Sequence, residues 1–146
     1  MAQFIVGVSH SFSISTGVIG DGVIAFEDME ANSFVGEFKG DVVTVAEYQR
    51  RDDAGRGGFG IRVKDGYVLD CYDYHRDKRC MMSYVNTARN TWRWVPPKSG
   101  LGLVMVRNRN NCVARQDGNR IRLWVGNRRI KSGDELFWPY GCGYKV

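Results

Sequence analysis

Apolar residues along the chain come in short runs that are separated by glycine, aspartate and charged residues. Short apolar runs between turn residues are typical of β-strands, whereas an amphipathic helix needs apolar positions three and four residues apart. The best helical stretch, residues 46–51, is short. Strands are predicted at residues 3–8, 23–26, 33–38, 42–45, 59–63, 67–71, 103–106, 112–115 and 121–125. Many short strands with little helix predict an all-β domain or a β-dominated α+β domain.

Turn residues between the apolar runs indicate which strands pair. An Asp-Gly step between two apolar runs is a strong hairpin signal, because both residues tolerate the backbone angles of a tight turn. Two such steps predict hairpins over residues 59–71 and 112–125. A Gly-Asp turn predicts a third pair, formed by residues 33–38 and 42–45.

Three segments between the predicted strands are expected to be loops. Residues 52–58 and 73–79 are rich in charge, and His75 in the second of them is expected to be a solvated loop histidine. Residues 91–102 hold Trp92 and Trp94 and a Pro-Pro step, which predicts an exposed excursion from the domain.

Length and composition favour one domain over residues 1–146. The 146 residues are 43% apolar, which is enough for one core but not for two. Eighteen glycines against three prolines fit tight turns between short strands. The apolar start has no basic lead-in, and no later run is long enough to span a bilayer. We therefore expect a soluble chain without a signal peptide, not secreted and without a membrane partner.

The four cysteines are expected to be buried thiols. Cys71, Cys80, Cys112 and Cys142 form no Cys-x-x-Cys pair and have no histidine pair nearby. This spacing argues against a structural zinc site and against a disulfide framework, so no metal is expected. Cys142 differs from the others because it lies among the aromatic residues at the end of the chain.

The net charge of +5 is unevenly distributed. Residues 1–88 hold nine basic and 13 acidic residues, and residues 89–146 hold 12 basic and three acidic ones. The split fits an acidic face for a basic peptide beside a basic face for a phosphate or an acidic partner, and it equally fits a solvated surface. Residues 107–129 mix basic and apolar residues, as nucleic-acid-binding hairpins do. A binding module is therefore an alternative to an enzyme.

The end of the chain carries a dense aromatic segment. A Ser-Gly-Asp turn at 132–134 leads to Phe137 and Trp138, and then to Tyr140 and Tyr144, which enclose two glycines and a cysteine. Three of the last nine residues are Trp or Tyr, so this segment is expected to pack into the body of the domain. A tyrosine beside glycines can present its hydroxyl in a cleft. The alternative is a last β-strand that only buries aromatic side chains.

Three motifs in order resemble the SET domain family of lysine methyltransferases. These are Gly20-Asp21-Gly22 followed by residues 34–40, then Tyr84-Val85-Asn86, and then residues 134–141. Residues 82–90 and 111–116 are most similar to the PR subfamily, and the resemblance covers residues 17–144. It implies the SET fold of short strands and small sheets with a knot-like C-terminal segment. Each motif alone is weak, whereas all three in order are specific.

The resemblance also implies an activity and a set of roles. Members of the family transfer a methyl group from S-adenosylmethionine to a lysine amine, most often on histone tails. The implied protein partner is a histone or another basic peptide, the implied location is nuclear or otherwise cytoplasmic, and nucleic acid remains a partner for the basic C-terminal half. The implied site residues are Tyr140 for catalysis, Gly20, Asp21, Gly22, Tyr84, Asn86 and Thr87 for the cofactor, and Phe137, Trp138 and Tyr144 for the substrate channel.

The chain departs from the family pattern at several positions. Thr87 stands where many members have histidine, Ser83 replaces a common arginine, and Pro139 replaces aspartate. No cysteine-rich segment flanks the domain within this sequence. These departures keep open a SET-like scaffold without catalysis that binds proteins or nucleic acids. Two histidines without a serine or cysteine nucleophile motif give no sign of a catalytic triad.

Overall fold

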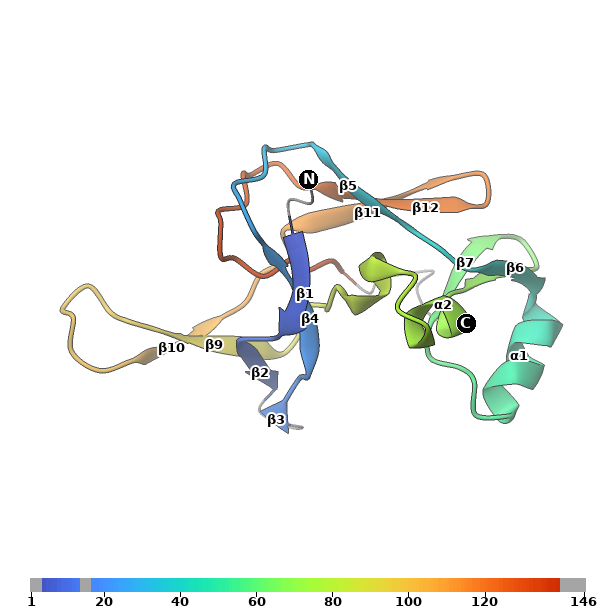
Figure 1. Ribbon diagram of the computed structural model, residues 1–146, viewed down its shortest axis with the longest axis horizontal. Helices are drawn as coiled ribbons and strands as arrows, with labels where there is room; N and C mark the ends of the chain where they lie inside the picture. The colour runs from blue at the N-terminus through green and yellow to red at the C-terminus, as the bar shows by residue number, and fades with distance from the viewer. Residues whose placement is uncertain (1–3, 14–16, 140–146) are drawn as a thin grey trace.

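The computed structural model describes residues 4–13 and 17–139. Within them, short antiparallel strands form four small sheets (Figure 1), and the hydrophobic core lies among the three sheets other than β10-β9-β2-β3. The β-dominated α+β class predicted from the sequence is confirmed. The sheets are β1 (Phe4–Val8) with β4 (Asp21–Ala25); β10 (Val104–Arg107), β9 (Thr91–Val95), β2 (Ser11–Ser13) and β3 (Gly17–Val18); β11 (Cys112–Asp117), β12 (Arg120–Val125) and β5 (Phe34–Phe38); and β6 (Asp41–Thr44), β8 (Tyr67–Asp70) and β7 (Gly60–Lys64).

The two hairpins predicted from Asp-Gly steps are present, as β7–β8 and β11–β12. The third predicted pair is wrong. β5 pairs with β12, and β6 pairs with β8 in another sheet. The chain changes sheets at Gly40, where a Cβ atom would stand 2.4 Å from the carbonyl oxygen of Asp70. The Gly-Asp step is therefore a close crossing over the backbone of β8, and not a hairpin turn.

The helical segments are short. α1 (Val45–Asp53) begins where Thr44 accepts a hydrogen bond from the Glu47 amide at 3.1 Å, as an N-cap residue does. α2 (Tyr72–Arg76) is followed by the 3₁₀ turn η1 (Met81–Tyr84). The expectation that residues 73–79 are a loop is thus wrong for its first part. Asp73 in the first turn of α2 and Arg76 in the last match the helix dipole.

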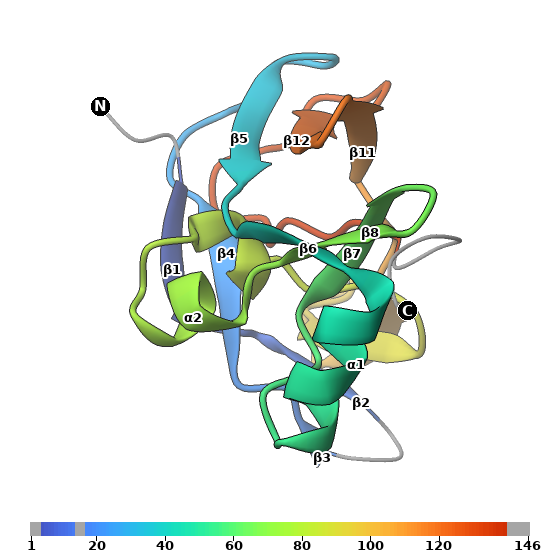
Figure 2. The same ribbon diagram turned by 90° about the vertical axis from the view of Figure 1, so that its right-hand side faces the viewer.

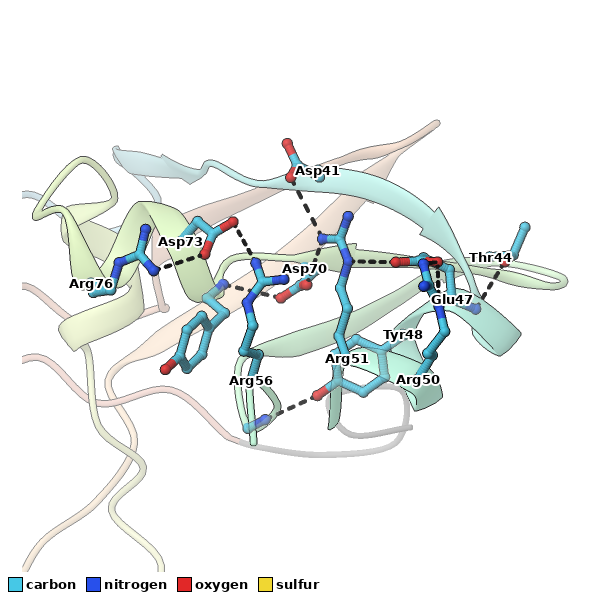
Figure 3. A network of polar contacts seen from close by, with 12 residues as sticks. Asp41, Thr44, Glu47, Tyr48, Arg50, Arg51, Arg56, Asp70, Asp73 and Arg76 are labelled. Carbon is cyan, nitrogen blue, oxygen red and sulfur yellow. Dashed lines mark hydrogen bonds and ion pairs between the residues drawn. The ribbon is translucent and has the colours of Figure 1, made fainter. Parts of the chain in front are cut away.

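Helix α1 lies beside the β6-β8-β7 sheet (Figure 2), and a network of ion pairs joins the two (Figure 3). Arg51 lies at its centre, with 2.9 Å from Nε to Glu47 and 2.9 Å from Nη1 to Asp70. Asp70 is only 2% exposed, and Asp41 adds a carboxylate 3.6 Å from the same guanidinium. These contacts lock the helix to the sheet.

The same region positions α2. Arg56, which follows α1, lies 2.6 Å from Asp73 at the start of α2 (Figure 3). The guanidinium holds the pKa of Asp73 below its ordinary value. Several carboxylates of residues 1–88 are therefore paired with arginines of the same half of the chain.

The core draws on three of the four sheets and on the segments that connect them. Its fully buried members include Val23 of β4, Leu123 of β12, and Met29, Ile130 and Leu136 from connecting segments. Cys71, Cys80 and Cys112 are buried free thiols, as expected from their spacing. Burial raises the pKa of Cys112 to about 12. Cys142 lies outside the described residues.

The β9–β10 hairpin extends away from the body at the left of Figure 1. It contains the segment 91–102 that was expected to be an exposed excursion. Leu101 and Leu103 at its tip are 83% and 61% exposed, while Trp94 stacks on Phe12 of β2 with ring centroids 5.7 Å apart. The base of the hairpin is thus fixed to the body, and its tip lies in solvent.

Candidate functional site

The three sequence motifs meet at Asn86. This residue follows η1, and its Nδ2 donates hydrogen bonds to the carbonyl oxygen of Asp21 at 2.9 Å and to Oε2 of Glu135 at 3.2 Å. Gly20, just before β4, accepts a backbone hydrogen bond from Ser9 at 2.7 Å. Residues far apart in the sequence therefore form one junction around a single amide side chain.

The two glycines of the first motif serve different purposes. Gly20 has a φ of +96°, a backbone conformation that L side chains rarely adopt. Gly22 has no such angle, but a Cβ atom there would stand 2.5 Å from Oε2 of Glu135 and 3.2 Å from Nδ2 of Asn86. Gly20 is thus required by the turn, and Gly22 by close packing at the junction.

A buried carboxyl group completes the junction. Glu135 is 8% exposed, and its Oε1 accepts hydrogen bonds from the hydroxyls of Ser9 at 2.6 Å and Ser11 at 3.3 Å. The candidate site residues derived from the sequence do not include Glu135 or the two serines. The sequence feature that could have identified Glu135 is its place as an acidic residue inside the closing motif, directly before Leu136.

Hydrogen bonds hold the C-terminal segment on both sides. On one side, Leu136 donates its amide to Val23, and Trp138 donates its amide to Asn86 at 3.0 Å. On the other, the side chain of Asn111 donates to the carbonyl of Glu135 at 2.9 Å and accepts from the amide of Phe137 at 2.8 Å. Residues 135–138 are thus threaded between Asn86 and Asn111. Tyr140 and Tyr144, the predicted catalytic and channel tyrosines, lie outside the described residues.

This arrangement matches a known family over most of the chain. The model of the SET domain family matches residues 20–141. The chain belongs to the SET domain family. Methyltransferases of this family use S-adenosylmethionine as the methyl donor. The resemblance read from the three motifs is thereby confirmed.

Solved structures share the fold. A humanized mutant of the Polycomb Repressive Complex 2 from Chaetomium thermophilum, bound to an inhibitor, superposes with a TM-score of 0.67 at 21% identity, covering 100% of this chain. A chain of ctPRC2 in an autoinhibited conformation, bound to S-adenosylmethionine, superposes with a TM-score of 0.64 at 19% identity and covers 99% of this chain. This chain spans only 16% of the length of either. A search of the curated proteins gives no match.

Beside the junction, the SET domain has a narrow apolar hollow with about 240 Å³ of empty space, part of it open to solvent. Trp138 forms one wall, packing at 5.0 Å against Phe38 and donating its indole N–H to the carbonyl of Val85 at 3.2 Å. Sequence reasoning placed Trp138 in a channel but missed Phe38, although Phe38 belongs to the opening motif. The remaining lining residues are Phe59, Ile61, Cys71, Met82, Ser83 and Val85.

Phe137 is not among the residues that line this hollow. It lines a separate, polar hollow together with Ser11, Asn111 and other residues. Phe137 and Trp138 are neighbours in an extended segment, in which successive side chains point in opposite directions. The structure therefore separates these two residues, which the sequence had grouped as walls of one channel.

His75 forms a stack of three rings next to the apolar hollow. Its ring lies 4.0 Å from that of Phe59 and 4.3 Å from that of Tyr84, both nearly parallel, and the Tyr84 hydroxyl donates to the His75 carbonyl at 3.0 Å. The expectation of a solvated loop histidine is therefore wrong. The Ser83 hydroxyl donates to the Cys80 carbonyl, so it accepts the hydrogen bond that joins it to Nδ1 of His75 at 2.7 Å.

Acidification is expected to destabilise the SET domain through His75. Burial lowers the pKa of His75 below its ordinary 6.5, and the nearby charge of Asp21 only opposes this shift. The folded state thus favours the neutral ring, so this stability is present above pH 6.5 and is lost as the pH falls toward the lowered pKa. Urea denaturation should show that the free energy of unfolding falls less between about pH 7 and about pH 5 in His75→Asn than in the wild type. His10→Asn, which replaces an exposed histidine, should leave this fall unchanged. Identical pH profiles of stability for the wild type and both variants would contradict the prediction.

Thr87, the other expected cofactor residue, follows Asn86 and accepts a weak hydrogen bond from the Arg89 amide at 3.4 Å. Within residues 4–13 and 17–139, no group of three or more His, Cys, Asp or Glu side chains is arranged to hold a metal ion. No helix in that part of the chain is long and apolar enough to cross a membrane.

Proposed function

We propose that this SET domain is a protein-lysine methyltransferase that transfers a methyl group from S-adenosylmethionine to a lysine amine. The observation that carries the proposal is the junction of the three motifs at Asn86, with an aromatic-walled hollow beside it. Direct methyl transfer needs alignment of two reactants in a water-poor site more than it needs covalent help from the protein. A junction that fixes a cofactor residue beside an apolar hollow suits that chemistry.

The described residues fit the cofactor. Nδ2 of Asn86 is held by Asp21 and Glu135, which fixes the amide and directs its Oδ1 as an acceptor. An ammonium group such as that of the cofactor's methionine end is a suitable donor for this oxygen. Gly20 and Asp21 present backbone at the same place, and the Tyr84 ring belongs to the adjacent stack. When bound, the cofactor supplies an electrophilic methyl group on a sulfonium.

The residues of the apolar hollow would prepare the substrate amine. A free lysine has a pKa of about 10.4, and apolar surroundings favour its neutral, nucleophilic form by desolvation. Trp138, Phe38 and Phe59 supply such walls, and their ring faces tolerate the positive charge of the methylated product. The hydroxyl of Tyr140 would orient the amine for in-line attack, and Tyr144 would add a further wall.

For the substrate we propose a basic protein segment such as a histone tail, and for the location the nucleus. The support is the shared fold with chains of a Polycomb Repressive Complex 2. The test is incubation of the protein with isotope-labelled S-adenosylmethionine and either histones or a whole-cell lysate, followed by mass spectrometry of lysine residues. Transfer to a lysine of any protein supports the activity, and transfer to histones supports the substrate. Calorimetry showing cofactor binding without transfer to any lysine would favour a scaffold that only recruits partners.

Asn86→Ala is expected to weaken binding of S-adenosylmethionine by about 1–3 kcal/mol, because it removes one polar partner from the bound cofactor. Calorimetric titration measures the change. Asn119→Ala, in the exposed turn between β11 and β12, is the matched control and should bind as the wild type does. An unchanged affinity in a folded Asn86→Ala protein would remove Asn86 from the cofactor site.

A further inference from the structure

We propose that the arginine-lined face between β10 and the C-terminal segment binds nucleic acid through its phosphates. This goes beyond lysine methylation and uses other residues. Two hollows, with about 1040 Å³ and 1470 Å³ of empty space that includes open solvent, share Arg109, Asn111 and Asp134 in their linings. The two hollows therefore adjoin, and together they are called the trough here. The basic residues that line it are Arg93, Arg107, Arg109, Arg115, Arg128 and Arg129.

The charges of this trough are largely uncompensated. Among the described residues, salt bridges are found for only one of these six arginines, Arg129, whose contact with Asp28 is long at 3.9 Å. The acidic residues in the linings are Asp134, which accepts a hydrogen bond from the Lys131 amide, and the buried Glu135. Several guanidinium groups without carboxylate partners on a concave surface concentrate positive potential.

The other half of the chain shows the opposite behaviour. Arg50, Arg51, Arg56 and Arg76 pair with carboxylates in or next to α1 and α2 (Figure 3), and Arg79 pairs with Asp77 just after α2. These pairs join charges of both signs within residues 1–88 and leave the acidic excess of that half unchanged, but they surround its arginines with carboxylates, whereas most arginines that line the trough have no carboxylate partner. The folded protein therefore concentrates the charge asymmetry of the sequence on the trough.

Local contacts prepare these guanidinium groups for phosphate. Arg107 lies over the ring of Trp92 at 5.6 Å, and Arg115 lies over that of Trp124 at 5.4 Å. Stacking on an aromatic face restrains a guanidinium while its N–H edge remains available for a bidentate contact. Arg93 is restrained differently, by a 2.7 Å hydrogen bond from Nη1 to Asn108.

A nucleic acid fits this surface better than an acidic protein does. Successive phosphates provide one charge about every 1.7 Å along a duplex, which suits several arginines spread over the trough. Arginine, which forms the whole basic lining of the trough, is well suited to bidentate phosphate recognition.

The test is fluorescence anisotropy of the full chain with a labelled DNA duplex and a labelled single strand, without S-adenosylmethionine. If three to five phosphates are contacted, affinity should fall roughly 40- to 500-fold between about 50 and 200 mM salt. Arg107→Ala/Arg109→Ala should weaken binding about tenfold and reduce the salt dependence by about one to two phosphate equivalents. Arg62→Ala/Lys64→Ala on β7 removes the same charge from exposed positions outside the trough and should change affinity less than about twofold.

Three results would overturn the proposal: no binding at low salt, equal losses in the two double variants, or tighter binding of polyglutamate than of DNA. The last result would assign the trough to an acidic protein. Methylation of a short lysine peptide should be unchanged in both double variants, because the four residues lie outside the junction and the apolar hollow. Failure of nucleic-acid binding and failure of the proposed catalysis are therefore separate observations.

Discussion

Tyr140→Phe is expected to reduce methyl transfer roughly 10²–10³-fold, as the loss of one preorganised hydrogen-bond donor does in other enzymes. The exchange removes one oxygen and almost no volume, so packing should be retained. Affinity for S-adenosylmethionine and the melting temperature should stay near the wild-type values. Transfer is measured with isotope-labelled cofactor at saturating peptide, so that kcat is separated from binding.

The segment that precedes Tyr140 is anchored by hydrogen bonds. Trp138 is held through its amide and its indole N–H to the Asn86 and Val85 carbonyls, and Pro139 follows it directly. A chain anchored two residues earlier restricts where the next side chains can lie. Tyr67→Phe, on an exposed strand residue, is the control for removing a phenol oxygen and should leave turnover unchanged.

Other outcomes for Tyr140→Phe are equally informative. Retained turnover would make Tyr140 a wall residue of the hollow and would move the search for the orienting group to another side chain. Loss of folding would show that the hydroxyl has a structural role. An inactive wild-type protein that still binds the cofactor would point to a recruiting scaffold, in line with the departures at Ser83 and Thr87.

The sequence predicted those parts of the fold that depend on local signals. The β7–β8 and β11–β12 hairpins each close over a few residues, so a turn motif and two apolar runs suffice to identify them. The pairing of β5 was wrong because its partner, β12, is far away in the sequence and is selected by packing. α2 was missed because its five residues are mostly charged or aromatic and show no apolar periodicity.

The candidate site shows the same division. Gly20, Gly22 and Asn86 were found because each lies in a motif that can be read from neighbouring residues. The contact between Ser9 and Glu135 joins residues 126 positions apart, and no local pattern announces it. The stack around His75 likewise exists only after β7, α2 and η1 have packed together.

The net charge of each half of the chain could be predicted from the sequence, but the ion pairs that those charges form could not. The sequence shows an acidic half and a basic half. Only the fold shows that Arg51 and Arg56 neutralise Asp70 and Asp73, while Arg107 and Arg109 form no salt bridge within the described part of the chain. Counting charges therefore gave equal weight to an acidic docking face and a basic one, and the ion pairs shift the balance to the basic face.

Glu135→Ala is expected to destabilise the protein by about 2–4 kcal/mol, because it leaves the buried hydroxyl of Ser9 without its acceptor and removes one of the two acceptors of the half-buried Asn86 amide. It should also weaken cofactor binding, since the Asn86 amide loses one of the two contacts that fix it. Urea denaturation gives the first quantity and calorimetry the second. Glu27→Ala removes an exposed carboxylate and should change stability by less than about 0.5 kcal/mol.

A double-mutant cycle decides whether Glu135 acts through Asn86. If the two side chains form one unit, Glu135→Ala should cost less in an Asn86→Ala background, with a coupling energy of about 0.5–3 kcal/mol. Glu135→Gln separates shape from hydrogen bonding, because its amide keeps an acceptor for Ser9 but turns a donor toward Nδ2 of Asn86. It should therefore fall between the wild type and Glu135→Ala in cofactor affinity. Purely additive effects would show that Glu135 stabilises the fold without orienting the residue on which cofactor binding is proposed to depend.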